Sequence, residues 1–458
     1  MNVNTFTFCV ILASYREDFA LHPLKSVVRT LSLTLCCSSL LLAPAIQAQS
    51  ADQWWFERSD LQLPRQTSAG VLENGLHYVL LPMPNTQHNV AIRMVMDGGL
   101  LQEQGGQSGS AMFSAAQMLG QLTVPAKALL DLNQTVVSLH TTTQEQMSQA
   151  ISELSYALRN DTLPAPDMLN KSVEQIAVDG RLLAPALSYA QQQQVQRSFD
   201  ALQSRLSQIN GAQAMEFKQR FYAPKNMTLV VVGDFNKRHL EQLIDQQFSD
   251  WHKNSATLQS AMVIPRLQAQ MQDVAKQNIS FNTLVPSPLG NDSKQQRRQA
   301  MLVQVANIAL QNRINQILQP YNLSAQTQVE WMMNRSLWSN LTIPGVSQEE
   351  SQKVQQQVKA EIERALSNGF SKAEFELAVA TQRAHLQAQT ELNQADDIRN
   401  QADRLVAAMA QRKVYVTPSS ELALFDLFMA HAYEGDLTPA LKQSWSNTPT
   451  LYVTPSAS

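Results

Sequence analysis

The residue types that most often bind metals are scattered along this 458-residue chain. A zinc site on a helix needs two imidazoles about one turn apart, because that spacing puts both rings on one face. No two of the eight histidines are three or four residues apart; they are His22, His77, His88, His140, His239, His252, His385 and His431. The sequence also lacks a phosphate-binding loop, a serine triad and a nucleotide-binding fingerprint. Residue spacing alone therefore indicates no local metal pair.

The segment from Gln219 to Asn236 is the most informative local pattern in the chain. Residues 212–221 have the apolar spacing of a helix, and Pro224 prevents its continuation. Residues 229–232 are an uncharged, mostly β-branched run that predicts a strand buried on both faces, and Gly233 ends it with turn chemistry. These signals predict a helix packed on a sheet.

Three stretches resemble the pitrilysin/insulinase-type zinc metallopeptidases, a family that includes the subunits of the mitochondrial processing peptidase. Residues 221–236, FYAPKNMTLVVVGDFN, are similar to the family segment Y-x-P-x-N-M-x-L-x-V-x-G-D. The resemblance extends from about Trp54 to about Leu405. The other two stretches are residues 72–81 with 90–98 and Glu103, similar to the opening hairpin of the family, and residues 347–377, similar to a helix pair of its second domain.

The resemblance implies an α+β fold of two similar domains, each an antiparallel-dominated sheet with helices packed on one face. We divide the chain into a signal peptide at 1–48, an N-terminal-like domain at 49–251, a linker at 252–266 and a C-terminal-like domain at 267–458. Halves of this family pair around a chamber, and this chain provides a single half. The resemblance therefore implies a partner: a second insulinase-type half or an active peptidase subunit.

Local signals predict the elements of the second domain. Strands are expected at 279–284, 328–331 and 337–343, with a helix at 296–318 between the first two. Ser347 with Glu350 forms a capping box, and apolar residues then recur every four positions to Leu366. Gly369 is a C-cap, and Ser371 with Glu374 caps the next helix.

The catalytic motif implied by the resemblance is degenerate. Active members carry H-x-x-E-H on the helix after the opening hairpin, and the register G-x-A-H-F-x-E-H falls on residues 109–116. Met112, Ala115 and Ala116 stand where His, Glu and His are needed. An alanine can neither bind a metal nor move a proton, and a thioether does not substitute for imidazole at zinc. All three residues are good helix formers, so the helix can persist without the chemistry.

The remaining implied site residues are also replaced or isolated. Glu174 and Asp179 are the candidates for the third zinc ligand, a glutamate on a later helix, although solvated helix charges explain both. The family's substrate-holding Arg and Tyr map to Gln319 and Gln326 in an ungapped count, and a gapped alignment could place Tyr321 at the tyrosine. Arg313 survives at a position that we interpret as structural.

Composition bounds the function class and the compartment. A net charge of −3 provides no basic stripe for a phosphate backbone, so no nucleic-acid partner is expected. Residues 31–42 form an apolar run too short for a comfortable membrane span; Lys25 and Arg29 precede it and the small-residue stretch 44–48 follows. This pattern predicts a cleaved signal peptide, a periplasmic protein and no stable membrane insertion. All three cysteines, Cys9, Cys36 and Cys37, lie in this leader, so no disulfide is expected in the mature chain.

We therefore interpret the sequence as a secreted, non-catalytic member of the family, a pseudopeptidase with no cofactor. It would complete or regulate a partner peptidase chamber, or bind unfolded peptides without cutting them. One alternative is an active zinc-dependent endopeptidase with displaced ligands. The other is a remnant of a longer protease with no function of its own.

Overall fold

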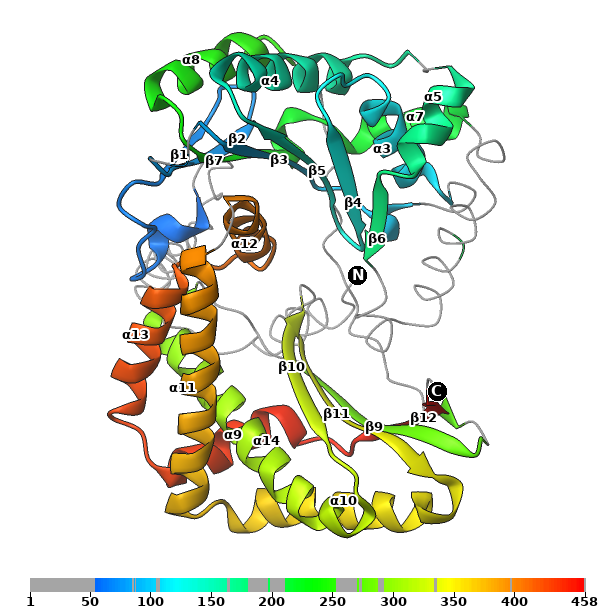
Figure 1. Ribbon diagram of the computed structural model, residues 1–458, viewed down its shortest axis with the longest axis vertical. Coiled ribbons are helices and arrows are strands. Elements are labelled where there is room, and N and C mark those ends of the chain that lie inside the picture. The colour runs from blue at the N-terminus through cyan, green and yellow to red at the C-terminus, as the bar shows by residue number, and fades with distance from the viewer. Residues whose placement is uncertain are drawn as a thin grey trace, which may run out of the picture. The chain divides into compact units, whose positions relative to one another are not determined.

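The computed structural model describes residues 54–84, 86, 88–103, 108–162, 165–179, 197, 211–252, 270–271, 274–286, 292–332, 336–395 and 398–456. The predicted signal peptide at 1–48 and residues 253–266 of the predicted linker lie outside these ranges. Residues 54–458 belong to one compact unit that contains two sheets, each with its own helices (Figure 1). No helix in the described ranges combines the length and hydropathy that a membrane span requires.

The first sheet has seven strands in the described residues, in the order β1-β2-β7-β3-β5-β4-β6. Neighbouring strands are antiparallel except β2 with β7 and β4 with β6. The strands are β1 Ser68–Val71, β2 His77–Pro82, β3 Val90–Met96, β4 Ala126–Asp131, β5 Thr135–Thr141, β6 Ile176–Asp179 and β7 Met227–Gly233.

The expected opening hairpin is wrong in one respect. Strands β2 and β3 follow one another in the sequence but do not pair, because β7 lies between them, parallel to β2 and antiparallel to β3. The predicted burial of residues 229–232 on both faces explains this order, since a strand apolar on both sides is most stable in the interior of a sheet. Strand β2 forms its hairpin with β1 instead.

One face of the first sheet is covered by helices that belong to the same half of the chain. The apolar side chains of these helices and of the inward-facing strand positions form one buried core, which includes Ile92, Leu154, Phe217 and Leu229. The helix predicted at 212–221 is observed as α7. The helices are α3 Ser110–Leu119, α4 Gln144–Arg159, α5 Pro166–Val173, α7 Gly211–Phe221 and α8 Lys237–Phe248.

The second sheet repeats the scheme with five strands in the described residues, in the order β10-β11-β9-β12-β8. The predicted N-cap is observed, because the Ser347 hydroxyl accepts a hydrogen bond from the Glu350 N–H at 3.3 Å; the same hydroxyl lies 2.6 Å from Glu350 Oε2. Gly369, at φ 70°, ends the same helix as predicted. The strands are β8 Gln270–Met271, β9 Lys276–Pro286, β10 Gln326–Met332, β11 Ser336–Ser347 and β12 Thr450–Pro455; the helices are α9 Lys294–Leu318, α10 Gln348–Asn368, α11 Lys372–Ala395, α13 Pro418–Met429 and α14 Leu437–Trp445.

Helix α12, Ile398–Ala410, covers part of the other face of the first sheet. Leu405 and neighbouring apolar residues of α12 are buried against Val230 and Val232 of β7. Arg93 of β3, only 4% exposed, donates through Nε to the carboxylate of Asp403 at 2.6 Å and through Nη2 to the carbonyl oxygen of Arg399 at 3.2 Å. Trp54, at the start of the described chain, is buried in the same cluster.

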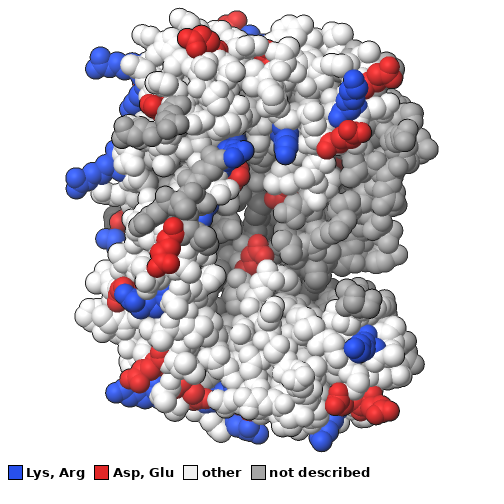
Figure 2. Space-filling model, in the orientation of Figure 1, with Lys and Arg blue, Asp and Glu red and all other residues white. Residues whose placement is uncertain are grey.

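The predicted fold class is confirmed: an α+β protein with two antiparallel-dominated sheets and packed helices. The domain boundaries at 49–251 and 267–458 stay a prediction. On the face drawn in Figure 2, lysine and arginine are interspersed with aspartate and glutamate.

Gly233 provides a direct test of the strand order. Its φ is +140°, and a Cβ there would lie 2.2 Å from the carbonyl oxygen of Asn89, which leads into β3. We expect Gly233→Ala to lower the free energy of unfolding by about 3–5 kcal/mol, because backbone strain and a clash with an immobile carbonyl add together. Urea unfolding followed by circular dichroism measures the change.

Gly345 is the matched control. Its φ is +74°, but a Cβ there would have nothing within 4 Å. Gly345→Ala should cost about 1 kcal/mol, from backbone conformation alone. Equal effects of the two substitutions would contradict the close approach of β7 to the start of β3.

Candidate functional site

Helix α3 is where the implied metal motif lies, and its N-terminus is firmly held. Gly109, with φ 86°, precedes the helix in a left-handed conformation. The buried carboxylate of Glu103 accepts hydrogen bonds from the N–H groups of Gly109 and Ala111, both at 3.0 Å. A carboxylate at a helix N-terminus satisfies free amides and interacts favourably with the helix dipole. Glu103 therefore has a structural role here.

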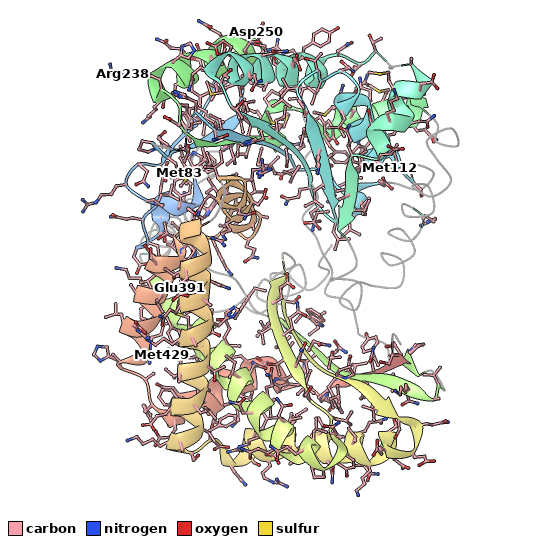
Figure 3. All side chains as sticks on the ribbon, viewed as in Figure 1. Met83, Met112, Arg238, Asp250, Glu391 and Met429 are labelled. Carbon is pink, nitrogen blue, oxygen red and sulfur yellow. The ribbon has the colours of Figure 1, made fainter. Side chains whose placement is uncertain are left out.

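The three motif positions are closed to solvent. Met112 is 1% exposed, and Ala115 and Ala116 are 0% exposed. They belong to the first core cluster, and their helix α3 contacts α5 and α7. Figure 3 labels Met112 in this helix layer. None of these side chains has an oxygen, a nitrogen or a thiolate, so the residues present do not fit zinc.

The candidates for the third ligand do not complete a site. The later helix expected to carry both Glu174 and Asp179 is wrong: α5 ends at Val173, Glu174 is its C-cap, and Ile176–Asp179 is strand β6, parallel to β4. The β-branched residues Ile176 and Val178 are two positions apart, and this spacing favours a strand. Glu174 is exposed, and the side chain of Asp179 is not among those that the structure describes. Across the described ranges, no three His, Cys, Asp or Glu side chains are grouped as a metal site would need.

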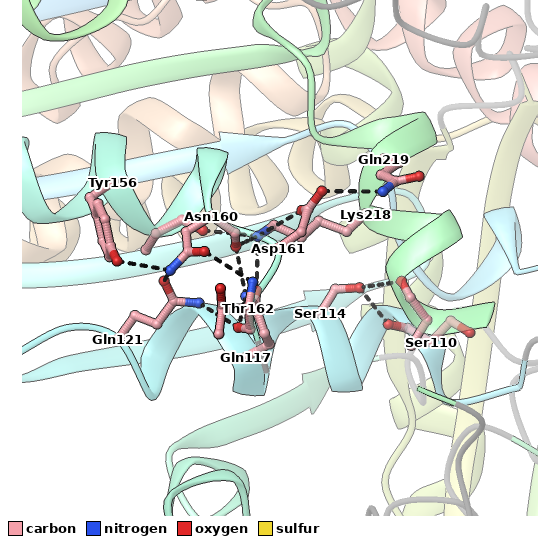
Figure 4. A network of polar contacts seen from close by, with 12 residues as sticks. Ser110, Ser114, Gln117, Gln121, Tyr156, Asn160, Asp161, Thr162, Lys218 and Gln219 are labelled. Carbon is pink, nitrogen blue, oxygen red and sulfur yellow. Dashed lines mark hydrogen bonds and ion pairs between the residues drawn. The ribbon is translucent and has the colours of Figure 1, made fainter. Parts of the chain in front are cut away.

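A buried polar network lies immediately beside the motif positions, and the sequence analysis missed it (Figure 4). Lys218 of α7 is 0% exposed. Its Nζ donates to Gln117 Oε1 at 2.9 Å and to the carbonyl oxygens of Ala157 and Asn160 at 2.9 and 2.6 Å, and it lies 3.6 Å from the carboxylate of Asp161. The ammonium group therefore joins α3, α7 and the end of α4.

Gln117 extends this network from Lys218 to Thr162. Its Nε2 donates to the carbonyl oxygens of Asn160 and Thr162 at 2.8 and 2.9 Å. One sequence signal could have indicated the burial of Lys218. The spacing of four residues places Lys218 on the same face of α7 as the apolar Ala214, which is buried. Nothing local could have identified the partners.

The positions equivalent to the substrate-holding pair lie in the second half and are exposed. Gln319 is the residue after α9 and begins the short 3₁₀ turn Gln319–Tyr321, and Gln326 is the first residue of β10. Tyr321 is partly buried, with Lys353 Nζ 5.5 Å from its ring centroid.

Arg313 has the structural role that its position suggested. It bonds both carboxylate oxygens of Glu374, with Nη2 at 2.8 Å from Oε2, and Nη2 also donates to the carbonyl oxygen of Gly369 at 2.8 Å. Its guanidinium lies 4.6 Å from the ring centroid of Phe370 and 3.7 Å from Glu361. These contacts join α9 to the end of α10 and the start of α11.

A hollow of about 580 Å³ lies beside this cluster, and its lining includes Arg313, Glu361, Arg364 and Glu374. The two arginines are paired with the two glutamates. The hollow therefore presents an internally balanced set of charges.

Comparisons with known proteins agree with the geometry. Residues 208–382 match the model of the family described as the peptidase M16 inactive domain. The chain is 23% identical to the "Probable zinc protease PqqL" of Escherichia coli strain K12 over 450 residues, which covers 88% of this chain and 46% of that protein. These matches support membership of the pitrilysin/insulinase-type (M16) peptidase family.

Solved M16 structures share the fold. A predicted insulinase family protease from Yersinia pestis superposes with a TM-score of 0.67 at 18% identity, covering 86% of this chain and 93% of that one. The periplasmic protease PqqL from Escherichia coli superposes with a TM-score of 0.66 at 20% identity, covering 87% of this chain and 48% of that one. The chain thus spans about half the length of the PqqL protein that it matches.

The buried ammonium of Lys218 should stabilise the M16 fold at this point. Lys218→Met keeps most of the apolar stem but removes the donor, so two carbonyl oxygens and the Gln117 amide oxygen lose a hydrogen bond in the interior. We expect a loss of about 3 kcal/mol in the free energy of unfolding, measured by urea denaturation. Glu216→Ala is the control at an exposed position of the same helix outside the network, with an expected change of about 0.5 kcal/mol or less. Similar effects of the two substitutions would contradict a stabilising network.

Glu374 predicts a pH dependence of stability. Hydrogen bonds from Arg313 are the main cause that lowers the pKa of this carboxyl from 4.5 to about 2. A lowered folded-state pKa contributes stability that is present above pH 4.5 and is lost as the pH falls towards 2. Because the pair is partly solvated and therefore screened, Glu374→Gln should lower the free energy of unfolding at pH 7 by about 1–2 kcal/mol, and the difference from the unmodified protein should shrink between pH 4.5 and pH 2.

The control for this pH profile is Glu376→Gln, because Glu376 is 63% exposed in a surface pair with Lys372. Its effect should stay within about 0.5 kcal/mol across the same pH range. A Glu374→Gln difference that is constant from pH 7 to pH 2 would show that the ionised carboxylate is not what stabilises the protein.

Proposed function

We propose that this M16 chain is a non-catalytic family member that completes or regulates the chamber of a partner peptidase. The observation that carries the proposal is the state of α3, where Met112, Ala115 and Ala116 are buried and offer no zinc ligand. The packing of α3, the Glu103 cap and the Arg313 cross-link support a scaffold that is kept without the chemistry.

The chain length supports a partner role. The alignment covers 46% of the PqqL protein of Escherichia coli and 48% of the solved PqqL chain, so this chain is similar to about half of a longer protease. A second insulinase-type half, on an active subunit, would provide the rest of a chamber. Unfolded peptides are the ligands that such a chamber would bind. The sequence pattern of the leader and the periplasmic location of PqqL support secretion to the periplasm.

Two measurements on the purified protein test the proposal. Metal analysis is expected to find no stoichiometric zinc, and unfolded peptides are expected to remain intact with or without a chelator. Stoichiometric zinc together with chelator-sensitive cleavage would overturn the proposal in favour of an active endopeptidase with displaced ligands. Co-purification with a family member that carries H-x-x-E-H would support the partner role over a remnant without function.

Restoring the motif should not restore activity. The triple substitution Met112→His, Ala115→Glu and Ala116→His rebuilds two ligands and the base, but Glu174 is exposed after α5, and the Arg/Tyr pair remains Gln319 and Gln326. The new polar groups would also be desolvated in the core, which costs several kcal/mol. We therefore expect no gain in hydrolysis and a lower midpoint of thermal unfolding.

The control for this experiment is the single substitution Met112→Leu, which keeps the volume and apolar character of the position. It should change neither zinc content nor hydrolysis and should alter stability by about 1 kcal/mol or less. Hydrolysis by the triple variant that a chelator abolishes would mean that a third ligand and a route for water are already present.

A further inference from the structure

The two sheets have four edges among the described residues, and one edge differs from the others. Strands β1 and β6 are four residues long and β8 is two residues long. Strand β10 has seven residues, QTQVEWM, with no proline and no lysine. Short strands, proline and lysine are the usual protections of an edge against pairing with another chain. Strand β10 lacks all three.

The backbone of β10 directs its odd-numbered amides towards this edge. The N–H of Ala325, the residue before β10, donates to Asn315 Oδ1 at 2.7 Å, and the N–H of Thr327 donates to Gln311 Oε1 at 2.8 Å. Side chains of α9 therefore satisfy these two amides. Amide direction alternates along a strand, so the next amides on this side belong to Val329 and Trp331. No hydrogen-bond acceptor for either amide is found among the described residues.

The sequence of β10 is compatible with antiparallel pairing to itself. A two-fold axis at Val329 would place Val329 opposite Val329 of the second copy and Thr327 opposite Trp331. Gln328 would lie opposite Glu330, so an amide faces a carboxylate and no two like charges are directly opposite. The Thr327 amide would exchange Gln311 for the Trp331 carbonyl oxygen of the second copy.

We propose that β10 is a self-pairing edge through which a second copy of this chain joins the second sheet, with Val329 at the two-fold axis. The interaction is isologous, because the same strand contributes to both sides. It is independent of any zinc chemistry and of the partner peptidase, since it needs only the strand edge.

Sedimentation velocity of the full chain over a dilution series tests the pairing. A strand interface of this size is small, so the change from one chain mass to two is expected in the micromolar range, up to about 200 µM. Val329→Pro removes the edge-directed N–H, which an edge strand tolerates, and should weaken dimerisation about tenfold or more. Val329→Ala is the matched control, because it removes the side chain and keeps the N–H.

The proposal is overturned if the chain sediments as a monomer at all concentrations. It is also overturned if Val329→Pro and Val329→Ala dimerise equally well.

A cysteine at Val329 tests the register even if the proline variant does not fold. Directly opposite, hydrogen-bonded residues of an antiparallel pair have Cα atoms about 5.5 Å apart, within the range of a disulfide. With Cys9, Cys36 and Cys37 replaced by serine, Val329→Cys should give a disulfide-linked dimer under mild oxidation. Gln356→Cys, exposed on α10, is the control and should stay monomeric. Equal cross-linking of the two variants would overturn the assigned register.

Discussion

The close packing of α3 against α7 and α4 is the constraint on which the site depends. Two small side chains, Ala115 and Ala116, let the helices approach closely, and the Ser114 hydroxyl donates to the Ala214 carbonyl oxygen of α7 at 3.1 Å and to Ser110 at 2.8 Å. A metal site needs space, polar ligands and a route for water. At the three motif positions this interface is instead apolar and closed to solvent.

Strand β7 extends the same constraint to the other side of the first sheet. Leu229 and Val231 face the helix layer, whereas Val230 and Val232 face α12. A strand that is buried on both faces joins two cores, and α12 belongs to the second half of the chain. The ion pair from Arg93 then fixes where α12 lies along the sheet. The first sheet is therefore covered by elements from both halves of the sequence.

The parts of the fold that the sequence could predict are those determined over a few residues. The Ser347 N-cap bond spans three residues and the Gly369 C-cap needs one backbone conformation, so a local pattern is sufficient for both. Strand order was not predictable in this way, because the insertion of β7 between β2 and β3 joins residues more than 130 positions apart. Glu174 and Asp179 were expected on a helix only because of the family resemblance, whereas the local sequence of Ile176–Asp179 favours strand β6.

The same distinction separates family likeness from catalysis. Gly233 is needed because a carbonyl oxygen lies 2.2 Å from where a Cβ would be, Glu103 caps α3, and Arg313 joins three helices. Each of these residues belongs to a stretch similar to the M16 family, and each has a role that depends on backbone geometry or burial rather than on a metal. Selection on the fold alone is sufficient to keep them.

Lys218, which joins α7 to Gln117 across 101 positions, contributes to the same fold without belonging to any recognisable motif. The similarity of this chain to the family therefore reflects how the fold packs. Metal binding and catalysis depend separately on which side chains α3 carries.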